Sequence, residues 1–209
     1  MRETAAAEPR PYHHGDLRRA LIDAARRLLE SEGPNALSLR AVAREAGVSP
    51  AAPYHHFKDK SELLDAVAHE GWDLLNELMT QARKREASVG DKLTALGVAY
   101  VRFARDNPAL YRVMYDASRD KDDLPEHVHQ EDDSAYCQVR NTLTEAGVGP
   151  LSELDLELAT TAAWCAAHGL AEMFAFKKFD PLKEAVGGDE AFLRGVFEHM
   201  GIFGRASQD

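Results

Sequence analysis

The stretch from Leu37 to Lys60 (LSLRAVAREAGVSPAAPYHHFKDK) constrains the fold of this chain more than any other. Four of its apolar residues recur at the spacing of one helix face: Leu39, Val42, Ala43 and Ala46. Gly47 then interrupts the helix, and Ser49 stands where an N-cap is favoured, directly before Pro50. The pattern predicts two short helices joined by a tight turn, a helix-turn-helix whose second helix enters the major groove of DNA. Ordinary helical hairpins share part of this pattern, and the polar and aromatic residues that follow it favour the DNA-binding interpretation.

The first positions of the predicted recognition helix offer little for direct base readout. None of the side chains at positions 50–53 can donate or accept a hydrogen bond at a base edge. The methyl groups of Ala51 and Ala52 can contact thymine. Pro53 has no amide hydrogen, so we expect an irregular first turn. We therefore expect recognition to depend on DNA shape as well as on direct readout.

Two groups of residues resemble the TetR-type (tetracycline-repressor) transcriptional regulators. The first group, within a match over roughly residues 13–70, consists of Arg40, Ala43 to Ser49 (AREAGVS), Tyr54, His56, Phe57, Lys58, Lys60, Leu63 and Leu64. The second group is Trp164, His168 and Gly169, which resembles the Trp-x-x-x-His-Gly signature in the ligand-binding half of one subgroup. The resemblance implies that Tyr54, His56 and Lys60 hold DNA phosphates. The expected DNA-binding residues are Ser38, Arg40, Ser49, Pro50, Ala51, Ala52, Tyr54, His55, His56, Lys58 and Lys60.

Charge is distributed unevenly along the 209 residues, whose net charge is −10. Residues 1–60 carry ten Lys and Arg against eight Asp and Glu, a net charge of +2. Residues 61–209 carry fifteen against twenty-seven, a net charge of −12. An N-terminal segment this weakly basic makes few phosphate contacts, so we expect the N-terminal segments of two chains to bind DNA together.

The chain is predicted to be all-α and to have three parts. Residues 1–12 are expected to form a flexible arm, either a disordered tail or a segment whose Arg10 reaches the minor groove. Residues 13–60 form a three-helix DNA-binding domain. Its first helix is predicted at 16–32 with Asp16 as cap, and Ser38 caps the second helix. Residues 61–209 form a helical ligand-binding and dimerisation domain.

Helix boundaries in the second domain follow from caps and breaks. Asp59 and Glu62 form a predicted capping box for a long helix that ends near residue 86 and links the two domains. Val48, in the turn directly after Gly47, is expected to be buried. The further helices are predicted at 91–106, 108–118, 133–146, 152–178 and 189–205. Breaks are expected at 107–108, 147–150 and 180–188, with an acidic loop at 119–133.

Aromatic and sulfur-containing side chains on these helices are candidates for a ligand pocket. The expected ligand-binding residues are Tyr100, Phe103, Tyr111, Met114, Tyr115, Trp164 and His168. Such residues more often form a core than a pocket. Trp164 and His168 lie four residues apart in an uncharged helical segment, so they share one face. His168 either faces a ligand or binds a neighbouring backbone carbonyl.

Several classes of protein lack support in the sequence. No phosphate-binding glycine loop, metal-ligand spacing or nucleophile motif is recognised, so no enzymatic activity, cofactor or metal is expected. The longest uncharged run, 158–171, is shorter than the ~20 residues of a membrane-spanning helix. Without a secretory signal, Cys137 and Cys165 are expected to be reduced thiols in a cytoplasmic protein.

These observations predict a transcriptional regulator, most simply a repressor, that responds to an unknown small molecule. It would bind a pseudo-palindromic DNA operator as a homodimer formed through the last two helices. Two alternatives remain open at this level. One is a DNA-binding regulator with a filled core and no effector, and the other is a helical adaptor that contacts proteins.

Overall fold

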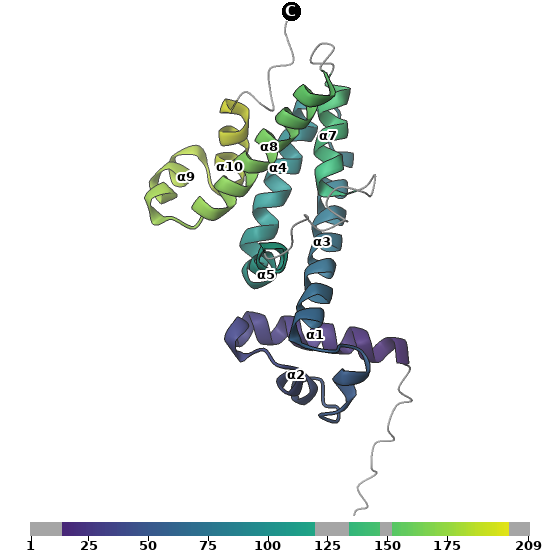
Figure 1. Cartoon of the computed structure of the whole chain (residues 1–209). Coiled ribbons are helices and arrows are strands. Elements are labelled where there is room, and N and C mark those ends of the chain that lie inside the picture. The colour runs from purple at the N-terminus through teal and green to yellow at the C-terminus, as the bar shows by residue number, and fades with distance from the viewer. Residues whose placement is uncertain (1–13, 120–133, 147–151, 201–209) are drawn as a thin grey trace, which may run out of the picture. The chain divides into compact units, whose positions relative to one another are not determined.

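The computed structural model describes residues 14–119, 134–146 and 152–200. The chain divides into two compact units, Met1–Val67 and Ala68–Asp209, which we call the head and the body. Every regular element in the described residues is helical, which confirms the predicted all-α fold class (Figure 1). None of the helices within these residues is both long and apolar enough to cross a membrane. The predicted arm, the acidic loop at 120–133 and the end of the chain lie outside the described residues.

The head is built from helices α1 (His14–Glu32) and α2 (Leu39–Glu45), two short 3-10 segments and the start of α3 (Lys60–Lys84). Its core consists of Leu21, Ile22, Ala24, Ala25, Leu28, Leu29, Leu37, Leu39, Val42, Ala43, Phe57, Leu63, Ala66 and Val67. Ser38 caps α2 as predicted, because its Oγ accepts a hydrogen bond from the Ala41 amide at 3.1 Å. The Arg27 guanidinium donates to Glu45 at 2.8 Å and ties α1 to α2. The Asp16 cap was a wrong prediction, since α1 begins at His14.

The recognition element differs from the predicted helix. Residues Ala52–His55 form a single 3-10 turn, which follows a turn through Pro50 and Ala51. Amides in this segment donate to carbonyls three residues earlier. The Tyr54 amide, for example, donates to the Ala51 carbonyl at 3.2 Å. Pro53 has no amide hydrogen, so the first intrahelical bond of a regular α-helix that begins at Pro50 cannot form. Ser49 is not the side-chain cap that was predicted, because the N-cap is Ala51 and no side chain caps the segment.

The turn before this element is held by the backbone. Gly47 adopts φ +69°, a left-handed conformation that favours glycine, and the Val48 amide donates to Ala43 O at 2.9 Å. Val48 is only half-buried, so its predicted burial is incomplete. One half of the predicted capping box at the start of α3 is confirmed, since the Glu62 amide donates to Asp59 Oδ1 at 3.0 Å. The return bond reaches one residue further than expected, since Glu62 Oε2 accepts from the Lys58 amide at 2.7 Å.

The body begins within α3 and continues through six further described helices, labelled in Figure 1. They are α4 (Val89–Asp106), α5 (Pro108–Arg119), α7 (Ala135–Glu145), α8 (Glu153–Met173), α9 (Asp180–Val186) and α10 (Asp189–His199). Helix α8 packs on α4 and α7, and α10 also packs on α4. Gly97 of α4 permits that second contact, because a Cβ there would lie 2.7 Å from the Phe197 ring.

Three helix boundaries in the body were predicted wrongly. The helix expected over 152–178 ends at Met173, the helix expected over 189–205 ends at His199, and the break expected over 180–188 contains helix α9. The real break is Gly187–Gly188, where φ is +98° and +110°. The sequence pattern hid α9 because Asp180 and Pro181, which suggested a loop, lie in its first turn, where proline is tolerated.

Candidate nucleic-acid interface and aromatic cluster

The structure brings the predicted DNA-binding residues together on the head. Eight of them are exposed: Arg40, Ser49, Pro50, Ala51, Tyr54, His55, Lys58 and Lys60. Ser38 is also exposed, although its hydroxyl is used as a cap, and Ala52 and His56 are half-buried. Tyr54 is 53% exposed, which is unusual for a large ring and leaves its hydroxyl accessible. This surface can offer phosphate contacts from Arg40, Lys58 and Tyr54.

Lys60 has a second role that the sequence did not indicate. Its Nζ donates to the Pro34 carbonyl at 2.9 Å and so holds the start of α3 against the segment between α1 and α2. A lysine ammonium has three hydrogens, so two remain for a phosphate. Lys60 therefore combines an exposed charge with an internal contact of the head.

Buried Phe57 anchors the recognition element from below. Its ring is 1% exposed and lies 5.4 Å from the Arg18 guanidinium of α1, within cation–π range. The His56 ring lies 6.5 Å from the same ring, at an angle of 54°. Pro53 is also buried. These contacts fix the short 3-10 segment, which lacks a regular helical ladder of its own.

In the body, five of the seven predicted ligand-binding residues form one aromatic cluster: Tyr100, Tyr111, Tyr115, Trp164 and His168. Trp164 is close to the Tyr100 ring, at 5.2 Å between centroids, and Tyr115 lies 4.6 Å from the His168 ring. Tyr136 of α7 joins at 5.9 Å from Trp164. Edge-to-face and tilted pairs of this kind are the preferred aromatic geometries.

The hydroxyl groups of this cluster form a hydrogen-bond network around His168. Its Nδ1 lies 2.6 Å from the Tyr111 hydroxyl and 3.1 Å from the Tyr100 hydroxyl. The Tyr100 hydroxyl also bonds that of Tyr115. A neutral His168 that accepts at Nδ1 carries its proton on Nε2. His168 thus binds tyrosine hydroxyls, which neither sequence interpretation had included.

The tyrosines of the cluster stay neutral well above their ordinary range. Burial raises the pKa of Tyr111 to about 12, with a smaller contribution from the negative charge of Glu172. Burial likewise raises the pKa of Tyr100 and of Tyr115, since the phenolate form loses its hydration. The tyrosines of the network are therefore neutral donors and acceptors at physiological pH.

Little empty space remains beside the cluster. A cavity of ≈ 10 Å³ is lined by Tyr100, Trp164 and neighbouring apolar residues, room for about one water molecule. The other two predicted pocket residues have packing contacts of their own. Phe103 lines a hollow between α3 and α4 together with Leu78. Met114 packs so closely on Gly71 of α3 that a Cβ at that glycine would lie 2.6 Å from the Met114 sulfur. The described conformation is one in which the cluster is filled by its own side chains.

Trp72 is a member of the cluster that the sequence reasoning missed. It lies on α3, is 4% exposed, and contacts Trp164 at 6.2 Å and Tyr115 at 5.5 Å between ring centroids. The spacing of apolar residues in α3 could have identified Trp72, because the buried residues Ala68, Trp72, Leu75 and Met79 repeat along one face of this helix. The cluster thus includes a residue of the helix that also supplies residues 60–67 of the head.

Comparisons with known proteins agree with both units. Residues 21–67 match the family of bacterial regulatory proteins described as tetR family, and residues 93–197, half of the chain, match the tetracyclin repressor-like C-terminal domain. A protein of unknown function from Rhodococcus sp. RHA1 is 31% identical, with 93% of this chain and 97% of that chain covered and a TM-score of 0.75.

Two further solved structures share the fold. A bacterial regulatory protein of the tetR family from Rhodococcus RHA1 is 24% identical, with 90% and 97% of the two chains covered and a TM-score of 0.63. A TetR-family transcriptional regulator from Haemophilus influenzae is 22% identical, with 78% and 88% covered and a TM-score of 0.59. The proteins of this family are DNA-binding transcription factors without enzymatic activity. The chain therefore belongs to the TetR family and is a DNA-binding transcriptional regulator.

Proposed function

We propose that this regulator is a ligand-responsive repressor that binds a pseudo-palindromic operator as a homodimer. Each head reads one half-site in successive major grooves, one DNA turn or a small multiple apart. The residues that hold each head on DNA are those predicted from the sequence, with Tyr54, His56 and Lys60 on phosphates. The low positive charge of one head supports the need for two.

Ligand response is supported above all by Trp72. This side chain touches Trp164 and Tyr115 in the cluster, and it belongs to α3, which continues into the head. A small molecule that separates the two indole rings changes the packing of that helix. It thereby favours a conformation in which the two heads no longer match the half-sites.

The filled cluster sets a condition on the effector. Among the described residues, the cavity beside the cluster is ≈ 10 Å³, so an effector at the cluster binds a conformation in which the rings have moved apart. It stabilises that conformation by as much as its affinities for the two states differ. The described conformation is then the DNA-binding one, and effector binding depopulates it.

The chain's only tryptophans, Trp72 and Trp164, give this proposal a direct experiment. A panel of small molecules is screened by tryptophan fluorescence and thermal shift, and hits are tested for release of an operator fragment. Trp164→Ala should abolish release while operator binding remains, with Phe176→Ala as control for an exposed ring. Release that survives in Trp164→Ala would place the effector elsewhere.

A second function is favoured by the same tight packing. A body filled with its own side chains suits a DNA-binding regulator without an effector, controlled only by its abundance. For such a protein, no compound raises the melting temperature or changes the tryptophan fluorescence. One hit that does both and also releases DNA rules this alternative out.

Dimerisation through α8 and α10 is supported by exposed apolar residues on both helices. They include Leu154, Leu158 and Met173 on α8 and Met200 at the end of α10. Small residues between them, such as Ala162 and Gly169, allow a second helix to approach closely. Size-exclusion chromatography with light scattering tests the homodimer directly.

A further inference from the structure

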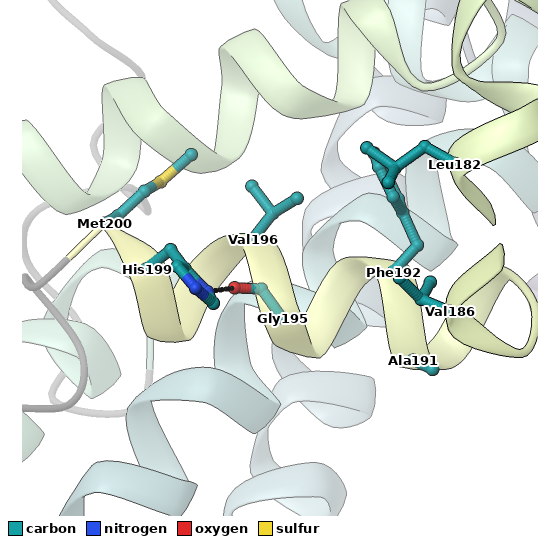
Figure 2. A pocket seen from close by; sticks show the side chains of 8 residues that line it. All are labelled: Leu182, Val186, Ala191, Phe192, Gly195, Val196, His199 and Met200. Atoms are coloured by element: carbon teal, nitrogen blue, oxygen red, sulfur yellow. Dashed lines mark hydrogen bonds between the residues drawn. The ribbon is translucent and has the colours of Figure 1, made fainter.

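A large apolar hollow lies between α9 and α10, away from the aromatic cluster. Its volume is ≈ 480 Å³, and it is lined by Leu182, Val186, Ala191, Phe192, Gly195, Val196, His199 and Met200. Figure 2 shows Leu182 and Val186 of α9 near Phe192 of α10, with Val196 and Met200 further along. Leu182 and Val186 remain 50% and 45% exposed, so much of the lining is still in contact with water.

The polar part of this lining is small. His199 Nδ1 lies 2.8 Å from the Gly195 carbonyl, so the imidazole donates to the backbone at this atom. The other lining side chains are apolar. The hollow therefore selects an apolar occupant and offers one imidazole nitrogen at its edge.

The N-terminal end of α8, opposite the end that lies near the hollow, carries large exposed apolar side chains. Leu154 and Leu158 are one helical turn apart and are 68% and 59% exposed, the largest exposures among the large apolar residues described. They project from the N-terminal turns, whereas the hollow lies at the C-terminal end. There the Phe174 ring that follows α8 lies 6.2 Å from the Phe192 ring of the hollow.

Charge is complementary between the same two ends. Exposed acidic residues, Glu153 and Asp155, flank Leu154, where Glu153 also pairs with Arg140 and Asp155 with Ser152. Exposed basic residues, Lys177 and Lys178, form the short segment between α8 and α9. Such a pattern favours pairing one end of α8 with the opposite end of another copy.

The middle of α8 has the small residues that this pairing needs. Cys165 is exposed and Ala166 and Gly169 are half-buried, so a second helix can cross there at short distance. In a dimer whose twofold axis is perpendicular to α8, the two copies of α8 run antiparallel and make the same contact twice. Leu158 lies seven residues before Cys165, and Met173 lies eight residues after it. A crossing at Cys165 thus brings Leu158 beside the partner's Met173 and directs Leu154 towards the partner's hollow.

We propose that the hollow between α9 and α10 is the socket for Leu154 and Leu158 of a second copy of this chain. The inference rests on the proposed homodimer and specifies its register. Each subunit inserts two leucines and receives two, and the acidic start of α8 lies against the basic segment of the partner. Helix α9, which the sequence did not predict, then forms one wall of the interface.

Chemical cross-linking tests this register. Both native thiols are removed by Cys137→Ser and Cys165→Ser, and Leu154→Cys is combined with Val186→Cys in the full chain. A short bismaleimide is then added, and products are separated under denaturing conditions. Within one chain the two ends of α8 are about 30 Å apart, too far for this reagent, so any Leu154-to-Val186 link joins two chains. The matched control combines Leu154→Cys with Arg112→Cys, an exposed position on α5.

A covalent dimer formed by the Leu154–Val186 pair, and by neither single variant nor the control pair, is the expected result. A dimer in light scattering that gives no such product overturns the socket but leaves the homodimer intact, and frees the hollow for a small apolar molecule. A monomeric wild-type chain overturns the homodimer itself. As a second measurement, Leu154→Ala with Leu158→Ala should raise the dimer dissociation constant at least tenfold, and an unchanged constant contradicts the socket.

Discussion

The head and the body use their functional residues in opposite ways. In the head, the candidate contacts are exposed side chains on and around a turn of four residues, which is held by buried Phe57 and Pro53 beneath. In the body, the candidate sensor is a buried network in which Tyr100, Tyr111 and His168 bond one another. The head is therefore prepared for its ligand as it stands, whereas the body must rearrange to admit one. Exposed contacts of the head such as Tyr54 can therefore change without loss of stability, whereas function and stability are coupled in the buried network of the body.

The largest expected effect is on the core of the body. Phe197→Ala leaves a cavity beside Gly97, because the ring is fully buried against that helix, and it should lower the free energy of unfolding by about 3–5 kcal/mol. Urea denaturation followed by circular dichroism measures the change. The head alone, by contrast, keeps its core in this variant. A loss below 1 kcal/mol would show that the body tolerates rearrangement without cost, contrary to the comparison.

DNA binding comes next in size and should respond to the head without any change in stability. Tyr54→Phe removes an exposed hydroxyl, so operator affinity should fall by about 1–3 kcal/mol per head on all sequences, while the melting temperature stays constant. A salt-titrated gel shift gives the affinity. Equal binding by the variant and the wild type would remove Tyr54 from the interface.

Lys60→Ala separates charge from packing within the head. Affinity should fall on all sequences and the salt dependence should become shallower, since one phosphate contact per head is lost. The lost bond to the Pro34 carbonyl should also lower the melting temperature slightly. Lys60→Arg, which keeps the charge, is the control. An unchanged salt slope in Lys60→Ala assigns the lysine to internal packing alone.

Alkaline pH should destabilise the body through its buried tyrosine network. The pKa of Tyr111 is raised to about 12, above its unfolded value of 10.0, so its contribution is complete below pH 10 and is lost as the pH rises towards 12. The melting temperature should decline across that window, and Tyr111→Phe should decline less. Absorbance of phenolate at high pH follows the same titration. A wild type and variant with parallel curves would contradict a buried Tyr111.

The smallest expected effect compares two helix caps. Ser38→Ala and Ser152→Ala each remove a hydroxyl that accepts a hydrogen bond from a backbone amide at 3.1 Å. Each change should lower the free energy of unfolding by about 1 kcal/mol. Only Ser38→Ala should also weaken operator binding, because α2 carries Arg40. Equal effects of the two changes on DNA affinity would mean that head and body are not separable.

The sequence alone determined what depends on neighbours along the chain. Apolar spacing, Gly47 and the caps at Ser38 and Asp59 act within a few residues, so the head and the all-α class could be predicted. The prolines also signalled an irregular recognition turn, although its 3-10 form came from the structure.

Only the tertiary structure decided the rest, because those contacts join residues that are distant in sequence. His168 meets Tyr111 across 57 positions, Trp72 joins Trp164 from another helix, and Lys60 reaches Pro34. Helix α9 and the hollow it forms with α10 likewise depend on packing at the end of α8 rather than on local periodicity. Side-chain spacing states which face of a helix is apolar, but it does not state which other helix covers that face.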